Sequence, residues 1–119
     1  ENLVEGCIRE TFGALVAAVQ ATRAENPRIR LALARIAVDE AAHAALSWEL
    51  HQWAEARLDR RARQRLNAAV APALATLREE AAATYSAEIT SQTGMPSGAE
   101  AVALVDALVE TLGLTAQAA

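Results

Sequence analysis

Apolar residues recur every three or four positions along most of the chain, which is the period of an amphipathic helix. Only five glycines and three prolines interrupt this pattern. A glycine and a proline mark residues 91–97 as a loop. The spacing predicts an all-α fold without strands. The four predicted helices cover residues 3–24, 27–56, 60–87 and 98–112.

The predicted helix ends carry residues that satisfy free backbone groups. Asn26 suits an N-cap, and Pro27 suits the first helical position that follows it. Asp59 is placed to cap the third helix, and Ser97 with Glu100 forms a capping box at the start of the last one. The first two helices are joined by a short turn, so they are expected to form an antiparallel hairpin. The tail, Leu114–Ala119, is expected to fray.

Composition restricts the class of protein. The chain has 119 residues, of which 53% are hydrophobic and 3% aromatic, and this predicts a single domain over residues 1–119. The net charge of -4 argues against nucleic-acid binding. The arginines between Arg57 and Arg65 are interpreted as a solvated face. No apolar run is long enough to span a membrane. No signal-peptide pattern opens the chain, so a cytoplasmic location is the default expectation.

The second predicted helix carries an acidic and a basic residue within its apolar stripe. Glu40 and His43 are three residues apart, so they are neighbours on the helix surface. A carboxylate in an apolar row is costly unless it is paired or binds a metal. This pair is therefore a candidate metal site, and the alternative is that both residues reach water at the edge of the stripe. The stripe consists of Ile29, Leu33, Ile36, Glu40, His43, Ser47 and Leu50.

The first helix offers two carboxylates to this pair. Glu5 shares a stripe with Ile8 and Phe12, whereas Glu10 lies on a face of small residues that another helix could approach closely. At 1.5 Å per residue, Glu10 lies about 20 Å before the turn and the Glu40/His43 pair about 22 Å after it, against about 27 Å for Glu5. The distance from the turn therefore favours Glu10, whereas the helix face favours Glu5. The residues leave both alternatives open.

Two other residue types carry less chemistry. His51 lies eight residues after His43 and is expected at the surface or partly buried, not as a ligand. The single cysteine, Cys7, cannot form an internal disulfide and is expected to be a small core residue.

Two segments together resemble a known family. They are Glu5-Gly6-Cys7-Ile8-Arg9-Glu10-Thr11-Phe12 and Ile36-Ala37-Val38-Asp39-Glu40-Ala41-Ala42-His43-Ala44-Ala45-Leu46-Ser47-Trp48. This pattern resembles the ferritin-like domain proteins of myxobacterial type, within the ferritin and rubrerythrin superfamily. The resemblance covers about half of the chain and corresponds to the second of two helical hairpins, whereas the part after Asp59 is similar only loosely.

The resemblance implies a ferritin-like helical bundle of four helices in up-down order, with a carboxylate-bridged di-iron centre. It implies Glu5, Glu40 and His43 as the ligands of one half-site, with Glu40 bridging two metals and Glu10 as a possible extra carboxylate. Carboxylate and imidazole ligands suit iron, and manganese or zinc less specifically. The implied activity is oxidation of ferrous iron or activation of oxygen.

The chain departs from that family in one respect. It contains a single Glu-x-x-His, and no histidine follows His51, so a second half-site is missing. Either the chain associates with itself, or it is the C-terminal half of a longer protein whose first hairpin supplies the other ligands. The alternative function is a metal-free helical module for structure or assembly.

Overall fold

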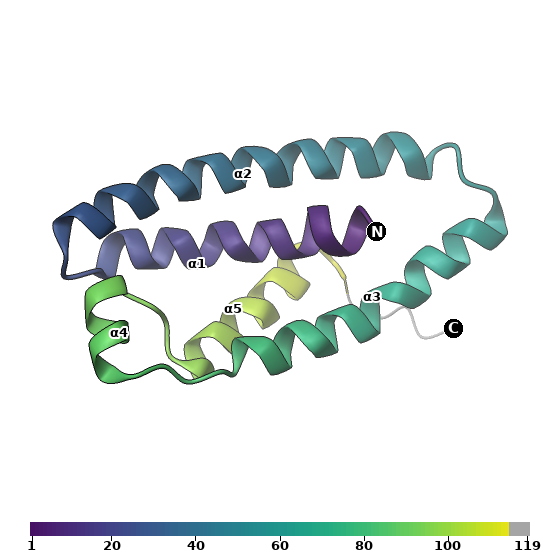
Figure 1. Cartoon of the computed structure of the whole chain (residues 1–119). Helices are drawn as coiled ribbons and strands as arrows, with labels where there is room; N and C mark the ends of the chain where they lie inside the picture. The colour runs from purple at the N-terminus through teal and green to yellow at the C-terminus, as the bar shows by residue number, and fades with distance from the viewer. Residues whose placement is uncertain (115–119) are drawn as a thin grey trace.

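The computed structural model describes residues 1–114, and within them every regular element is helical, with no strand. An initial π-helix, η1, continues directly into α1, and four further α-helices follow (Figure 1). This confirms the all-α fold class. The predicted fraying of the tail lies outside the described residues apart from Leu114. The bounds are η1 Leu3–Arg9, α1 Glu10–Arg23, α2 Pro27–Glu55, α3 Arg60–Ala81, α4 Ala87–Thr93 and α5 Gly98–Thr111.

The prediction of four helices is wrong in the region after α3. The third helix ends at Ala81 instead of residue 87, and a separate short helix, α4, occupies part of the predicted loop. The hydroxyl of Ser86 accepts a hydrogen bond from the backbone N–H of Ile89 and so caps the start of α4. Gly94 ends this helix with φ of 65°, a conformation that glycine adopts without strain. The cap at Ser86 thus begins a separate helix where a continuation of α3 was predicted.

The first two helices form the predicted antiparallel hairpin. The side chain of Asn26 accepts hydrogen bonds from the backbone N–H groups of Arg28 and Ile29, which confirms it as the N-cap of α2. Near the far end of the hairpin, the indole N–H of Trp48 donates to the hydroxyl of Thr11 at 3.1 Å. Figure 1 shows α1 and α2 side by side along the length of the molecule.

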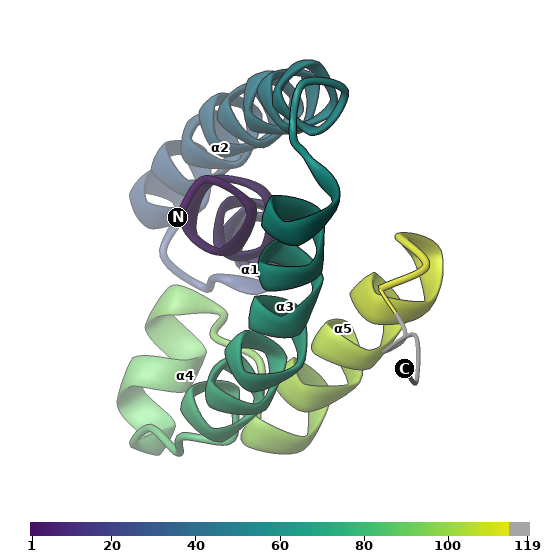
Figure 2. The ribbon, with the colours of Figure 1, turned by 90° about the vertical axis from the view of Figure 1, so that its right-hand side faces the viewer.

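Most of the hydrophobic core lies between the first helix and the C-terminal helices. Residues of η1 pack there against α3 and α5, so the first helix lies between α2 and the C-terminal helices (Figure 2). Two ion pairs support the same packing, Arg9 with Glu80 at 2.7 Å and Arg78 with Asp106. The buried core residues are Leu3, Cys7, Ile8, Val70, Leu74, Leu77 and Val105.

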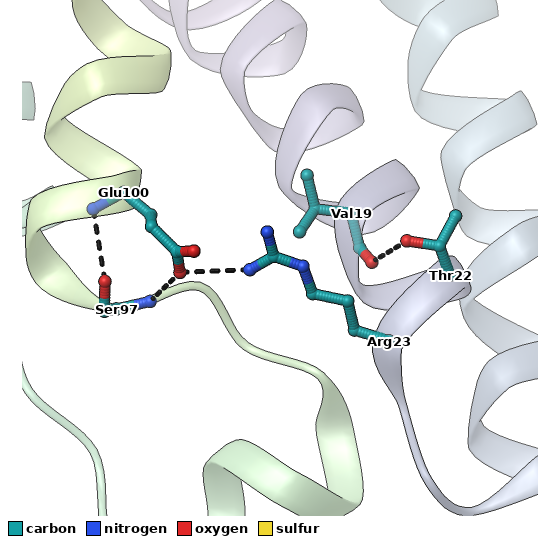
Figure 3. A network of polar contacts seen from close by, with 5 residues as sticks. All are labelled: Val19, Thr22, Arg23, Ser97 and Glu100. Carbon is teal, nitrogen blue, oxygen red and sulfur yellow. Dashed lines mark hydrogen bonds and ion pairs between the residues drawn. The ribbon is translucent and has the colours of Figure 1, made fainter.

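The predicted capping box at the start of α5 is confirmed and has a second role. The hydroxyl of Ser97 accepts from the backbone N–H of Glu100, and the Glu100 carboxylate accepts from the backbone N–H of Ser97. The same carboxylate forms an ion pair with Arg23, the last residue of α1, at 3.0 Å (Figure 3). The backbone N–H of Ser97 and the Arg23 guanidinium lower the pKa of Glu100. One side chain therefore joins the end of α1 to the beginning of α5.

The helices do not include a membrane span. Within residues 1–114, none combines the length with the apolar character that crossing a bilayer demands.

The core predicts a large effect of truncating Ile8. This side chain is fully buried, so Ile8→Ala should lower the free energy of unfolding by about 2–5 kcal/mol through lost burial and a residual cavity. Leu31→Ala is the control, because Leu31 is exposed and its truncation should change stability by less than about 0.5 kcal/mol. Urea denaturation followed by circular dichroism measures both. Equal effects would contradict this placement of the core.

Candidate site at the interface of the first two helices

The first helix begins with a seven-residue π-helical segment, η1. In a π-helix each N–H donates to the carbonyl five residues back, so a turn holds more residues than an α-turn. The N–H of Cys7, for example, donates to the carbonyl of Asn2 at 2.9 Å. Side chains of η1 therefore point in directions that differ from those predicted by an α-helical period of 3.6 residues.

Ser47 of α2 is the centre of the polar contacts between the two helices. Its backbone carbonyl accepts from the amide of Asn2 at 3.0 Å and from the thiol of Cys7 at 3.2 Å. Its hydroxyl donates to the Glu10 carboxylate at 3.2 Å. These contacts tie the α2 backbone to η1 and bring one carboxylate of the first helix against α2.

The helices approach closely at this level because Gly6 has no side chain. A Cβ atom at Gly6 would lie 2.7 Å from the hydroxyl oxygen of Ser47 and 2.8 Å from the side-chain oxygen of Asn2. Both distances are shorter than real Cβ atoms tolerate. The polar cluster at Ser47 therefore depends on a glycine at this position.

Glu40 and His43 have different environments. Glu40 is half-buried, and its carboxylate lies 4.0 Å from the position of a Cβ on Gly13 of α1, so it faces the first helix. His43 is exposed on the flank of α2. Ser47 follows His43 by one helical turn and Glu40 precedes it by three residues. His43 therefore lies between the levels of Glu40 and of the Glu10 contact.

Glu5 and Glu10 also differ. The side chain of Glu5 is 65% exposed and lies 3.6 Å from the guanidinium of Arg9. Glu10 is half-buried against α2. The predicted stripe of Ile8 and Phe12 faces the core formed with α3 and α5, whereas the face of small residues, which includes Glu10, packs on α2. The structure thus brings Glu10, and not Glu5, next to the helix that carries Glu40 and His43.

Other polar residues complete the interface without joining the cluster. The hydroxyl of Thr11, which accepts from Trp48, donates to the carbonyl of Cys7 at 2.6 Å. His51 packs edge-on against the Trp48 ring and lies 3.8 Å from the Glu55 carboxylate. These contacts agree with the prediction that His51 is a partly buried side chain.

Sequence reasoning missed the roles of Asn2, Gly6 and Ser47. Ser47 belongs to the stripe of the second helix that contains Glu40 and His43, but a serine there carries no signal for a hydrogen bond across the interface. Gly6 is a signal that could have been used, because a glycine within a helix often marks a close approach of another backbone.

An apolar groove lies beside the site. It has a volume of about 230 Å³, and Gly13, which faces Glu40, forms part of its wall. The ion pair of Arg9 and Glu80 contributes polar atoms to its lining. The groove is lined mainly by Phe12, Val16, Leu77, Tyr85, Met95 and Pro96.

The described part of one chain does not gather a complete metal site. Within residues 1–114, no three side chains of histidine, cysteine, aspartate or glutamate lie together in a way that could hold an ion.

Cys7 is fully buried, and burial together with the nearby Glu10 charge raises the pKa of its thiol to about 11. Cys7 is therefore a core thiol, as predicted from the sequence, and not a nucleophile at neutral pH.

The Cys7 pKa predicts slow thiol chemistry. With a pKa of about 11 in the folded chain and 9.0 when exposed, the thiolate fraction at pH 8 should fall roughly a hundredfold on folding. A thiol-specific reagent at pH 8 should therefore label the folded chain at least that much more slowly than the chain in urea.

The same shift predicts a pH dependence of stability. Because the pKa of Cys7 is raised in the folded chain, the stability that the protonated thiol contributes is complete below pH 9. It is lost as pH rises through about 11. Between pH 8 and pH 11, the parent chain should therefore lose more stability than Cys7→Ala. Fast labelling at pH 8, or identical pH profiles, would contradict a buried thiol.

The close approach at Gly6 predicts opposite effects at two glycines. Gly6→Ala should destabilise the chain by about 1–3 kcal/mol, because the new methyl group overlaps Ser47 and Asn2. Gly13→Ala is the matched control, since its Cβ would meet only Glu40 at an ordinary 4.0 Å. It should stabilise the helix by up to about 1 kcal/mol. Thermal denaturation of both variants measures the difference, and the same sign for both would refute the close contact.

Comparison with known proteins finds no relative to guide the interpretation: no family model, no curated protein and no solved structure matches the chain. The interpretation of the site therefore depends on its own residues.

Proposed function

We propose that the chain supplies one half of a carboxylate-bridged metal site of ferritin-like type, with di-iron as the metal centre. The proposed ligands are Glu40, His43 and a carboxylate of the first helix. Glu10 is the first-helix carboxylate that the contact with α2 favours, and Glu5 is the one that the family resemblance favours.

The observation that carries this proposal is the entry of two carboxylates into one helix interface. Glu10 reaches α2 at Ser47, and Glu40 reaches α1 at Gly13. Each of these half-buried carboxylates loses part of its hydration in this alanine-rich interface. A cation between them would offset both costs, and His43 lies on α2 between their levels with its imidazole accessible.

The donor set fits this kind of metal. Carboxylate oxygens and an imidazole nitrogen suit iron, and also manganese or zinc. When bound, a di-iron centre would supply electron transfer to oxygen or oxidation of ferrous iron. The π-helix beside Glu10 is a second support, because such segments occur frequently at functional sites.

One chain provides too few ligands for a two-metal centre. Bundle-type centres use two Glu-x-x-His pairs and two further glutamates, and this chain has one such pair. A second copy related by a two-fold axis would supply the same groups again. The proposed assembly is therefore a four-helix bundle made of two η1–α1/α2 hairpins.

Metal titration tests the proposal. Under anaerobic conditions with ferrous iron, we expect about two metals per pair of chains, as two Glu-x-x-His pairs would hold. At metal concentrations a hundred times the dissociation constant, stability should rise by about 2.7 kcal/mol. Glu40→Ala and His43→Ala should lose both effects, whereas His51→Ala, the matched control, should keep them. No bound iron in the parent chain would refute the metal site.

The two glutamates of the first helix can be separated in the same assay. If Glu10 is the ligand, Glu10→Ala should lose iron binding and Glu5→Ala should keep it, because Glu5 only pairs with Arg9 at the surface. The reverse result would support the ligand set that the family resemblance implies. Circular dichroism of each variant confirms that the helices are intact.

The second candidate is a metal-free helical module for assembly. One observation favours it, namely that α2 buries only Ala44 and exposes several large apolar side chains. This function would leave stability and association unchanged by iron, manganese or zinc.

A further inference from the structure

The exposed side of α2 carries an apolar stripe of its own. It has alternating steps of four and three residues, the spacing of the contact positions in a coiled coil. All of its members are exposed, and Figures 1 and 2 place α2 at the edge of the molecule, with α1 on one side of it. We call this set the outer stripe, and it consists of Ala32, Ile36, Asp39, His43, Leu46, Leu50 and Trp53.

The outer stripe has one acidic and one basic position, and both lie at its middle. Asp39 and His43 separate an apolar half towards the start of α2 from an apolar half towards its end. Within residues 1–114 neither side chain forms an ion pair. We propose that two copies of this chain pair antiparallel through their outer stripes, with Asp39 of each copy facing His43 of the other.

The positions of the apolar residues fix this register. With the two-fold axis at the level of residue 41, Ile36 faces Leu46 of the second copy and Ala32 faces Leu50. At each end Ile29 faces Trp53. Every apolar position then faces an apolar position of the second copy. Asp39 faces His43 once on each side of the axis.

Other alignments lose this match. A parallel pair would place Asp39 against Asp39 and His43 against His43, so that like groups would meet. An antiparallel pair shifted by one heptad would place both polar residues against apolar ones, which buries polar groups without partners. Charge complementarity therefore selects a second copy of the chain and a single register.

The pairing also bears on the proposed metal site. Glu40 lies on the flank of the outer stripe that faces α1, so pairing brings Glu40 and His43 of both copies towards one four-helix interior. Because an imidazole has two nitrogens, His43 can bind a metal with one and donate to a carboxylate with the other. The inference rests on the proposed function only for this completion of the ligand set, since the apolar match does not require a metal.

Substitution of two residues with nearly equal exposure tests whether the outer stripe forms the interface. Leu46 is 65% exposed and lies in the outer stripe, whereas Val38 is 68% exposed on another face of α2. Sedimentation equilibrium is measured in the presence of a chelator. The parent chain and Val38→Asp should show twice the chain mass of 12.6 kDa, and Leu46→Asp should show the single mass. A parent chain that stays monomeric at all concentrations, or equal disruption by both variants, would overturn the proposal.

Disulfide trapping tests the register. The double variant Ile36→Cys/Leu46→Cys should form a covalent dimer in air, because each new thiol faces the other type across the axis. Each single variant should form little covalent dimer, since its thiol would face a leucine or an isoleucine of the second copy. Cys7 is fully buried and does not compete. Efficient cross-linking of Ile36→Cys alone would indicate a parallel pair and overturn the proposed register.

The two proposals can fail separately. A metal-free dimer that binds no iron would support the pairing and refute the metal site. Iron binding by monomeric Leu46→Asp, at the stoichiometry of the parent chain, would refute completion of the site by a second copy.

Discussion

The structure depends on the burial of the first helix from two sides. Cys7 and Ile8 have almost no exposed surface, because α2 covers one side of this helix and α3 with α5 cover the other. The two sides differ in chemistry. Towards α3 and α5 the contact is aliphatic, whereas towards α2 it consists of small side chains and hydrogen bonds to Ser47. Every long-range contact of the candidate site is formed on this second side.

The helices and their caps were predictable from the sequence because both are local properties. A period of 3.6 residues predicts the first, second and last helices, although η1 at the start of the first is π-helical. Asn26, Asp59 and Ser97 cap helices where expected. The end of α3 was not predictable in the same way. Alanines continue past Ala81 and favour a longer helix, and only the capping serine at residue 86 competes with them.

The carboxylates of the first helix show which features of the site could not be predicted from the sequence. Counting residues along two antiparallel helices placed Glu10 level with the Glu40/His43 pair, and this depends only on helical rise. Favouring Glu5 on its helix face assumed that the stripe of Ile8 and Phe12 faces α2, whereas these side chains pack against α3 and α5. The four-helix bundle and the metal remain predictions, because both depend on groups that one chain does not supply. The exposed apolar side of α2 and the half-buried carboxylates within the hairpin interface are the two features on which the proposals rest.

The π-helix also has a consequence for how this segment could vary in length. A bond to the fifth residue encloses one residue more than a bond to the fourth, so loss of one residue between Leu3 and Arg9 could be absorbed by a return to the α-helix. Both ends of the hairpin would then stay in place, and the residues before and after the deletion would keep the faces that they present now. The π-helical turn would thus let this segment lose one residue without turning Asn2 or Glu10 away from their contacts with Ser47.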